Sequence, residues 1–199
     1  RQADEILSEG KADLIALGRQ ERILAGGVQE INWESLASFD ATNAFSMRSE
    51  DPPAASRPFD HQRDGLIPSG GAAIVALENM EEARRRGADI LGRVVSYAFS
   101  SDGDKLAVPS GDGLCRCMRE CLALAESLAS QVDYVTAHAT STPVGDAVEA
   151  EAIAKVFGEA SGGPNDRDLP WVSSLKSMTG QEMWMAGAAQ VVYSILMAR

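Results

Sequence analysis

The sequence predicts an α/β protein with a largely parallel sheet, and two observations lead to that prediction. Through the second half of the chain, short apolar segments alternate with helical segments. Strands that alternate with crossover helices build a layered α/β protein around parallel strands. The 199 residues include 45% hydrophobic and 24% charged residues, a composition typical of a globular domain with a real core.

The first half of the chain is predicted to contain a helix, a strand and a second helix, and then, after a loop, another strand and a short helix. A helix ends at Gly18, a short buried strand then runs into a glycine turn, and a helix with a loop follows. A Pro-rich polar loop comes next, and then a strand and a short helix that closes at Gly87. In that order these segments are residues 3–20, 22–31, 32–45, 46–65 and 71–89.

The second half predicts three strands, each followed by a helix. The strands are rich in β-branched and aromatic residues, and the first helix is amphipathic. The last helix is apolar and rich in small residues, as expected of a helix buried inside a layered protein. In chain order these segments are residues 90–101, 114–129, 132–138, 146–157, 170–177 and 180–198.

Charge and hydropathy exclude several classes of function. The net charge of −11 argues against non-specific binding to nucleic acid or to an anionic membrane surface. No run of 18 apolar residues predicts a membrane span, and no charged-then-apolar leader predicts secretion. Because the first residue is Arg1 and not Met, we expect the chain to be a piece of something longer.

All three cysteines lie in one predicted helix, at Cys115, Cys117 and Cys121. An odd number of cysteines without a secretory leader indicates a reducing compartment. The spacing is not C-x-x-C and no histidine is near, so buried thiols are favoured over a metal site.

One of only two histidines, His138, follows a predicted strand in the turn AHATSTPVGD. Ligands bind at the carboxyl ends of strands in open α/β sheets, and Thr140 and Thr142 add hydroxyl groups there. Asp146 is expected to cap the next helix, with Glu149 completing a capping box. Alternatively, Asp146 and Glu149 only start the helix and the histidine is structural.

A second turn, in SSLKSMTGQEMWMAG, has the same layout of strand, polar turn and helix. Lys176 lies just past the strand, and Thr179 is expected to cap the helix with Glu182 as its partner. Gln181 then falls in the first helical turn, where backbone N–H groups point outward. We expect the two turns to face one cleft.

The motifs AHATSTPVGDAVEAEAI and KSMTGQEMWMAGAA resemble the C-terminal active-site motifs of the β-ketoacyl-acyl carrier protein synthases. That family pattern is a His-Gly-Thr-x-Thr-x-x-Gly-Asp turn followed by Lys-x-x-x-Gly-His. Upstream, SRPFDHQRDGLIPSGGAAIVALENMEEARRRGA resembles the family's Arg-Pro-Phe-Asp and Arg-Asp-Gly motifs and its glycine-rich strand. The segments VPSGDG and TPVGD are similar to the type I bacterial branch.

The resemblance implies a thiolase-like layered α/β/α fold, present only in part. Residues 1–88 would end the N-terminal half, and residues 89–199 would start the C-terminal half. The implied activity is decarboxylating condensation of an acyl thioester with malonyl-acyl carrier protein, in fatty acid or polyketide synthesis. It implies a cytoplasmic homodimer, with acyl carrier protein as partner and neither nucleic acid nor membrane. No cofactor is bound, since the phosphopantetheine arm belongs to the carrier protein.

The resemblance also implies a role for each matching residue. His138 would polarise the malonyl thioester carbonyl and stabilise its enolate. Lys176 would support the electrostatics of the site, and Glu149 would belong to the network of that lysine. Thr140 and Thr142 would hydrogen-bond the phosphopantetheine arm.

Three departures from the family pattern stand out. The nucleophilic cysteine is absent, because none of the three cysteines matches its position, and the chain alone would be inactive. Gln181 replaces the second family histidine, and it can donate a hydrogen bond but cannot titrate near neutrality. Ala139 replaces a glycine, which would be strained if that position needs a positive φ.

Three hypotheses follow. The chain belongs to a condensing enzyme whose nucleophile lies upstream, or to a non-catalytic chain-length subunit in a heterodimer, a role that Gln181 would suit. The third hypothesis is an unrelated small-molecule binding domain with a chance likeness.

Overall fold

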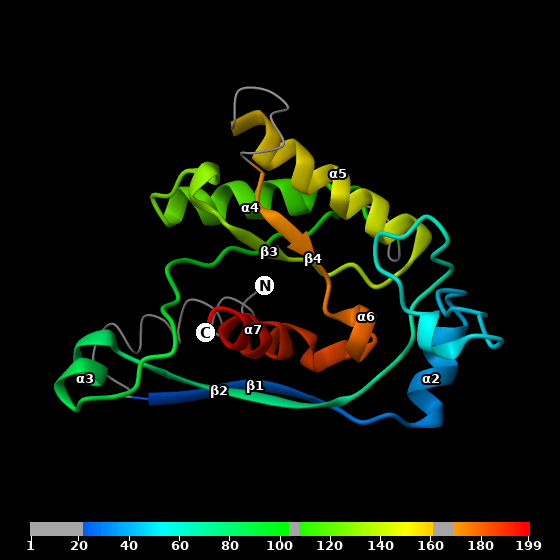
Figure 1. The fold of residues 1–199 in the computed structure, drawn as a ribbon, viewed down its shortest axis with the longest axis horizontal. Helices are drawn as coiled ribbons and strands as arrows, with labels where there is room; N and C mark the ends of the chain where they lie inside the picture. The colour runs from blue at the N-terminus through cyan, green and yellow to red at the C-terminus, as the bar shows by residue number, and fades with distance from the viewer. Residues whose placement is uncertain (1–21, 104–107, 161–168) are drawn as a thin grey trace. The chain divides into compact units, whose positions relative to one another are not determined.

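The computed structural model describes residues 22–103, 108–160 and 169–199 and has mixed α/β structure (Figure 1). The described residues form two compact units. The first unit holds residues 22–28, 72–93 and 184–199, and the second holds 29–71, 94–103, 108–160 and 169–183. The helix predicted over residues 3–20 lies outside the described residues.

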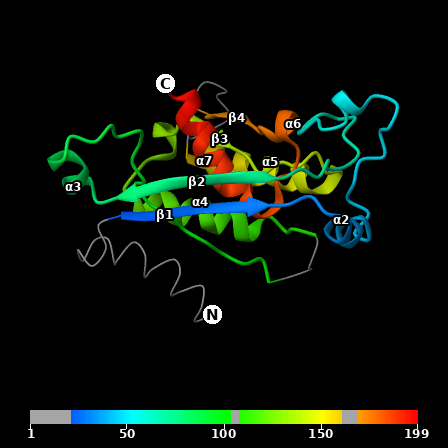
Figure 2. The same cartoon turned by 90° about the horizontal axis from the view of Figure 1, so that it is seen from below.

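The first unit is built on a two-stranded sheet of β1 (Arg22–Gln29) and β2 (Gly71–Glu78), which run antiparallel (Figure 2). The turn predicted after a short first strand is wrong, because Gly26 lies inside β1. A Cβ there would come 2.2 Å from the carbonyl oxygen of Ala73, so glycine permits the close approach of β2.

Two helices complete the first unit, α3 (Met80–Arg85) and α7 (Ala186–Met197). The side chain of Asn79 accepts hydrogen bonds from the first turn of α3, and Gly87 follows its end with φ 71°. The strand and the short helix predicted over residues 71–89 are therefore confirmed.

The second unit contains the parallel strands β3 (Tyr134–Thr136) and β4 (Trp171–Ser173), with Val135 paired to Val172. Helices α4 (Asp112–Leu124) and α5 (Pro143–Ala160) lie side by side against this pair of strands (Figure 1). Its helices are α2 (Trp33–Asp40), α4 (Asp112–Leu124), α5 (Pro143–Ala160) and α6 (Lys176–Thr179). Single 3₁₀ turns occur at Pro52–Ala54, Ala129–Gln131 and Met183–Met185.

The core of the second unit lies between α4, α5 and β3. It is made of small and medium apolar side chains, because the helices pack closely on a short sheet. Its buried members are Cys115, Ala129, Ala137, Ala139, Ala152, Ile153, Val156 and Phe157.

The strand predicted over residues 90–101 is wrong, since no residue between 88 and 103 is in a strand. The β-branched residues Val94 and Val95 favour an extended chain, but a strand also needs a hydrogen-bonded neighbour. Both side chains are exposed. Within the described residues, no helix is long and apolar enough to cross a membrane.

Candidate active site

The two predicted turns lie side by side because β3 and β4 are parallel neighbours in register. The Ala137 N–H donates to the Ser173 carbonyl at 2.9 Å, which continues the ladder one residue beyond the strands. The Ser174 hydroxyl then donates to the Ala139 carbonyl at 2.8 Å. The structure thus brings the His138 turn and the Lys176 turn together.

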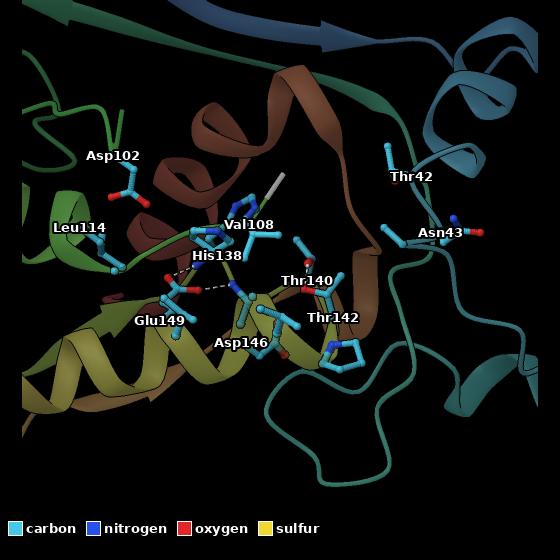
Figure 3. A pocket seen from close by; sticks show the side chains of 18 residues that line it. Thr42, Asn43, Asp102, Val108, Leu114, His138, Thr140, Thr142, Asp146 and Glu149 are labelled. Atoms are coloured by element: carbon cyan, nitrogen blue, oxygen red, sulfur yellow. Dashed lines mark hydrogen bonds between the residues drawn. The ribbon is translucent and has the colours of Figure 1, made fainter. Parts of the chain in front are cut away.

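A cavity of about 630 Å³ opens on the His138 turn (Figure 3). Polar groups on its wall include the side chains of His138, Thr140 and Thr142, and the apolar wall is contributed mainly by the 108–114 segment and α5. The labelled side chains around it are Thr42, Asn43, Asp102, Val108, Leu114, His138, Thr140, Thr142, Asp146 and Glu149. A cavity of this size suits a small organic group or an extended chain.

Glu149 holds the backbone of the histidine turn. One of its carboxylate oxygens accepts from the His138 N–H at 2.8 Å and the other from the Ala139 N–H at 2.7 Å (Figure 3). The predicted capping box is wrong, because α5 already begins at Pro143. Proline starts the helix three residues early, since its fixed φ and missing N–H suit the first helical position.

Asp146 lies in the first turn of α5 and is only 1% exposed. Its Oδ2 accepts from the Phe59 N–H at 2.9 Å and lies 3.7 Å from Nε of Arg63. Burial raises the pKa of Asp146, while the Phe59 hydrogen bond and Arg63 oppose that shift. Asp146 therefore joins the helix to a loop far away in the sequence.

That loop, residues 57–63, forms several hydrogen bonds to the turn that leads into α5. The Arg57 N–H donates to the Ser141 hydroxyl at 3.0 Å, and Arg63 donates to the carbonyls of Thr142 and Pro143 at 3.1 and 2.6 Å. The motif RPFDHQRDG resembles the family pattern, but the sequence alone predicts no role for it. The two arginines of this motif are the sequence feature that could have indicated the role, because guanidinium groups in a loop can donate to several carbonyls at once.

Ser141 is the residue of the histidine turn that adopts the left-handed backbone conformation. It has φ 72° and is fully buried, whereas Ala139 is not among the residues with positive φ. Alanine in place of the family glycine therefore causes no strain at position 139. The Thr140 and Thr142 hydroxyls lie 3.2 Å apart, and both threonines contribute to the cavity wall.

Lys176 is the first residue of α6 and is 1% exposed. Burial lowers its pKa, and the carboxylates of Glu182, Glu149 and Asp146 partly oppose that shift. The Lys176 Nζ makes no hydrogen bond to a described residue. Its backbone N–H reaches the Ser174 hydroxyl at 3.3 Å, which fixes it next to the His138 turn.

The His138 side chain is exposed toward the cavity, yet the walls withdraw it from bulk water. This desolvation and the positive charge of Lys176 lower the pKa of His138, and Asp146 opposes them. The imidazole is therefore neutral at neutral pH, with one nitrogen free to donate a hydrogen bond.

The predicted position of Gln181 in a first helical turn is wrong. Thr179 ends α6 instead of capping a helix, and Gly180 follows it with φ 74°. Gln181 then bridges to residues 67–69, with its N–H on the Ile67 carbonyl at 2.7 Å and its carbonyl accepting from the Ser69 N–H at 2.9 Å. Its side-chain Oε1 is buried and makes no hydrogen bond to a described residue.

The three cysteines lie on α4 and are unpaired, and none of them contributes to the cavity wall. Cys115 is buried in the core, and burial raises the pKa of Cys117. Within the described residues, no three His, Cys, Asp or Glu side chains are placed to hold a metal ion.

The cavity wall includes the imidazole of His138 and the hydroxyls of Thr140 and Thr142, whereas Lys176 and Gln181 do not line it, so the expectation that both turns face this one cleft is not met. Two family models match the chain. "Beta-ketoacyl synthase, C-terminal domain" matches residues 91–199, and "Beta-ketoacyl synthase, N-terminal domain" matches residues 10–83. The chain belongs to the beta-ketoacyl synthase family, which rules out a chance likeness.

Curated relatives and solved structures agree with this assignment. The chain is 42% identical to 3-oxoacyl-acyl-carrier-protein synthase 1 of Haemophilus influenzae and 41% identical to that of Escherichia coli. These matches cover 93% and 92% of this chain but only 43% of each relative. The chain thus spans less than half the length of the curated relatives it matches.

Among solved structures, a beta-ketoacyl synthase from Burkholderia phymatum matches with a TM-score of 0.86 and 37% identity, over 96% of this chain and 45% of that one. A type II polyketide ketosynthase, solved in complex with its acyl-carrier protein, matches with a TM-score of 0.81 and 35% identity, over 92% of this chain and 45% of that one.

The charge on Lys176 predicts how His138 titrates. In an NMR titration, the His138 imidazole should have its midpoint below 6.5, its ordinary value, and Lys176→Met should raise that midpoint. The imidazole of His138 takes up a proton more readily in the unfolded chain than in the folded one. The free energy of unfolding therefore falls as the pH drops from 6.5 through the lower, folded-state midpoint of His138. His61, with its side chain 87% exposed, is the internal reference. A His138 midpoint that Lys176→Met leaves unchanged would contradict the coupling.

The two hydrogen bonds of Glu149 predict a loss of stability on amide substitution. Glu149→Gln leaves one of the two backbone N–H groups without an acceptor, at a cost of about 1–3 kcal/mol in the free energy of unfolding. Denaturant unfolding measures this cost. Glu151→Gln, at an exposed position on the same helix, is the matched control and should change stability little. Equal effects of the two variants would show that Glu149 does not hold the turn.

Proposed function

We propose that the protein containing this chain condenses an acyl thioester with malonyl-acyl carrier protein, with loss of CO₂, in fatty acid or polyketide synthesis. The observation that carries the proposal is the neutral imidazole of His138, aimed into a cavity whose wall includes Thr140 and Thr142. The identity of about 40% to 3-oxoacyl-acyl-carrier-protein synthases supports it.

In this proposal His138 donates a hydrogen bond to the malonyl thioester carbonyl as CO₂ leaves and negative charge grows on that oxygen. A neutral imidazole can act in this step because one of its two ring nitrogens carries an N–H that can donate to the oxygen. Desolvation by the cavity walls and the positive charge of Lys176 lower the pKa of His138 and so favour its neutral state, and Glu149 fixes the backbone on which the imidazole is carried.

Thr140 and Thr142 would bind the phosphopantetheine arm of the carrier protein, and no other cofactor is needed. Their hydroxyls can donate to the amide carbonyls of an extended arm along the cavity. The ketosynthase solved with its acyl-carrier protein supports the choice of partner.

The nucleophile of the reaction would lie outside this chain, and the chain alone would then be inactive. This part of the proposal is supported by the place of the three cysteines on α4, away from the cavity wall. Thiolase-like α/β/α layering, with the end of one half at about residues 1–88 and the start of the other at 89–199, belongs to the same proposal. So do a cytoplasmic location and a homodimer.

A second candidate is a non-catalytic chain-length subunit that works in a heterodimer. One observation favours it, since Gln181 replaces the second family histidine and its buried Oε1 makes no hydrogen bond to a described residue. The presence of His138, Lys176 and both threonines favours the condensing enzyme instead.

The proposal predicts that His138→Ala abolishes CO₂ release from malonyl-acyl carrier protein. Removing one oxyanion donor costs roughly 10²- to 10³-fold in rate in other enzymes. The assay is release of labelled CO₂ by the protein containing this chain, with His61→Ala as the matched control. Unchanged CO₂ release in His138→Ala would overturn the assignment.

Gln181→His separates the two candidates. A second imidazole should raise the rate of condensation in an enzyme, whereas a chain-length subunit should show no condensation with either residue. Single-turnover condensation with acyl and malonyl carriers measures the rate. A variant that binds substrate normally and gains no rate would mean that the site is arranged around glutamine or does not condense.

A further inference from the structure

Residues 108–114 contribute much of the apolar part of the cavity wall, at the point where a loop enters α4. Val108 and Pro109 lie before the helix begins at Asp112, and Leu114 lies in its first turn. A loop and a helix end have few backbone hydrogen bonds of their own to fix them. The position of this wall therefore depends on contacts to other parts of the chain.

The carboxylate of Asp102 makes two of these contacts. Its Oδ2 accepts from the Ser110 N–H at 2.7 Å, and its Oδ1 accepts from the Gly113 N–H at 2.7 Å. The hydrogen bonds from Ser110 and Gly113 lower the pKa of Asp102, so both oxygens are charged acceptors at neutral pH. One side chain thus binds both the loop before α4 and the first turn of the helix.

Glycine at position 113 allows the close approach of this carboxylate. A Cβ there would clash with Oδ1 of Asp102. The two residues before Asp102 are bonded to the same helix. The Ser100 hydroxyl donates to the Gly113 carbonyl at 2.5 Å, and Arg116 donates to the Ser101 carbonyl at 2.8 Å. Three consecutive residues are thus tied to the start of α4.

Asp102 and the segment that it binds line the same cavity as His138, Thr140 and Thr142 (Figure 3). The wall is polar where the threonines contribute to it and apolar where residues 108–114 do. A phosphopantetheine arm carries amide groups separated by methylene and methyl groups. It could therefore use both kinds of wall at once.

We propose that Asp102 is a positioning residue that holds residues 108–114 as the apolar wall on which the phosphopantetheine arm of the carrier-bound substrate packs. This inference rests on the proposed function and deepens it, because it adds a residue that sets the affinity for that arm. The methylene and methyl groups of the arm contact Val108 and Leu114 while its amides bind the threonines. The family resemblance covers VPSGDG and gives no role to Asp102.

Amide hydrogen exchange in the protein containing this chain tests the role of Asp102 without any assay of activity. Asp102→Asn leaves one of the two N–H groups without an acceptor and removes the charge from the other bond. The amides of Ser110 and Gly113 should then exchange roughly tenfold faster. Gly113→Ala should speed exchange at Ser110 as well, since its Cβ displaces the carboxylate without removing it.

The matched control is Asp112→Asn, at the exposed first residue of α4, which should change these exchange rates little. Unchanged exchange at Ser110 and Gly113 in a folded Asp102→Asn variant would overturn the proposal. The same exchange rates in Asp102→Asn and Asp112→Asn would overturn it too.

Steady-state kinetics separate positioning from a general loss of stability. Asp102→Asn should raise the KM for malonyl-acyl carrier protein in CO₂ release roughly tenfold with little change in kcat, because it loosens a binding wall and leaves His138 in place. A partly unfolded enzyme would instead lose kcat at an unchanged KM, and that result contradicts the proposal. If the wild type releases no CO₂, the proposed function fails, while the exchange rates still decide whether Asp102 holds the wall.

Discussion

The buried carboxylate of Asp146 is the constraint on which the rest of the candidate site depends. It is placed by the first turn of α5, and it accepts from the Phe59 N–H and lies near Arg63. Phe59 adopts φ 66°, a conformation that a bulky residue adopts only when its surroundings compensate. Arg63 in turn satisfies the carbonyls of Thr142 and Pro143. Loop, turn and helix are thus fixed together by one charge and its partners.

Electrostatics then determine the state of the histidine. The walls of the cavity and the charge of Lys176 both disfavour the protonated imidazole, while burial lowers the pKa of Lys176 itself and nearby carboxylates oppose that shift. An arrangement of this kind needs buried charges of both signs at close quarters, which is costly for stability and typical of functional sites.

The departures from the family pattern at positions 139 and 181 differ in their structural consequences. Alanine at position 139 is harmless, because the left-handed residue of the turn is Ser141. Gln181 is held by two backbone hydrogen bonds to residues 67–69, so the backbone at this position is fixed whatever side chain it carries. The change from the family imidazole to an amide therefore leaves the path of the backbone intact.

The sequence by itself determined the helices α4, α5 and α7, the strands β3 and β4 and the order of the two polar turns, because hydrophobic period and turn residues are local signals. It also determined the family, through long ordered motifs. Only the tertiary structure decided that Glu149 holds the His138 backbone, that residues 57–63 form hydrogen bonds to the turn and that Lys176 is buried. It also decided that residues 90–101 form no strand. These features depend on partners far away in the chain, and local patterns carry no information about which distant donor or charge a buried group will meet.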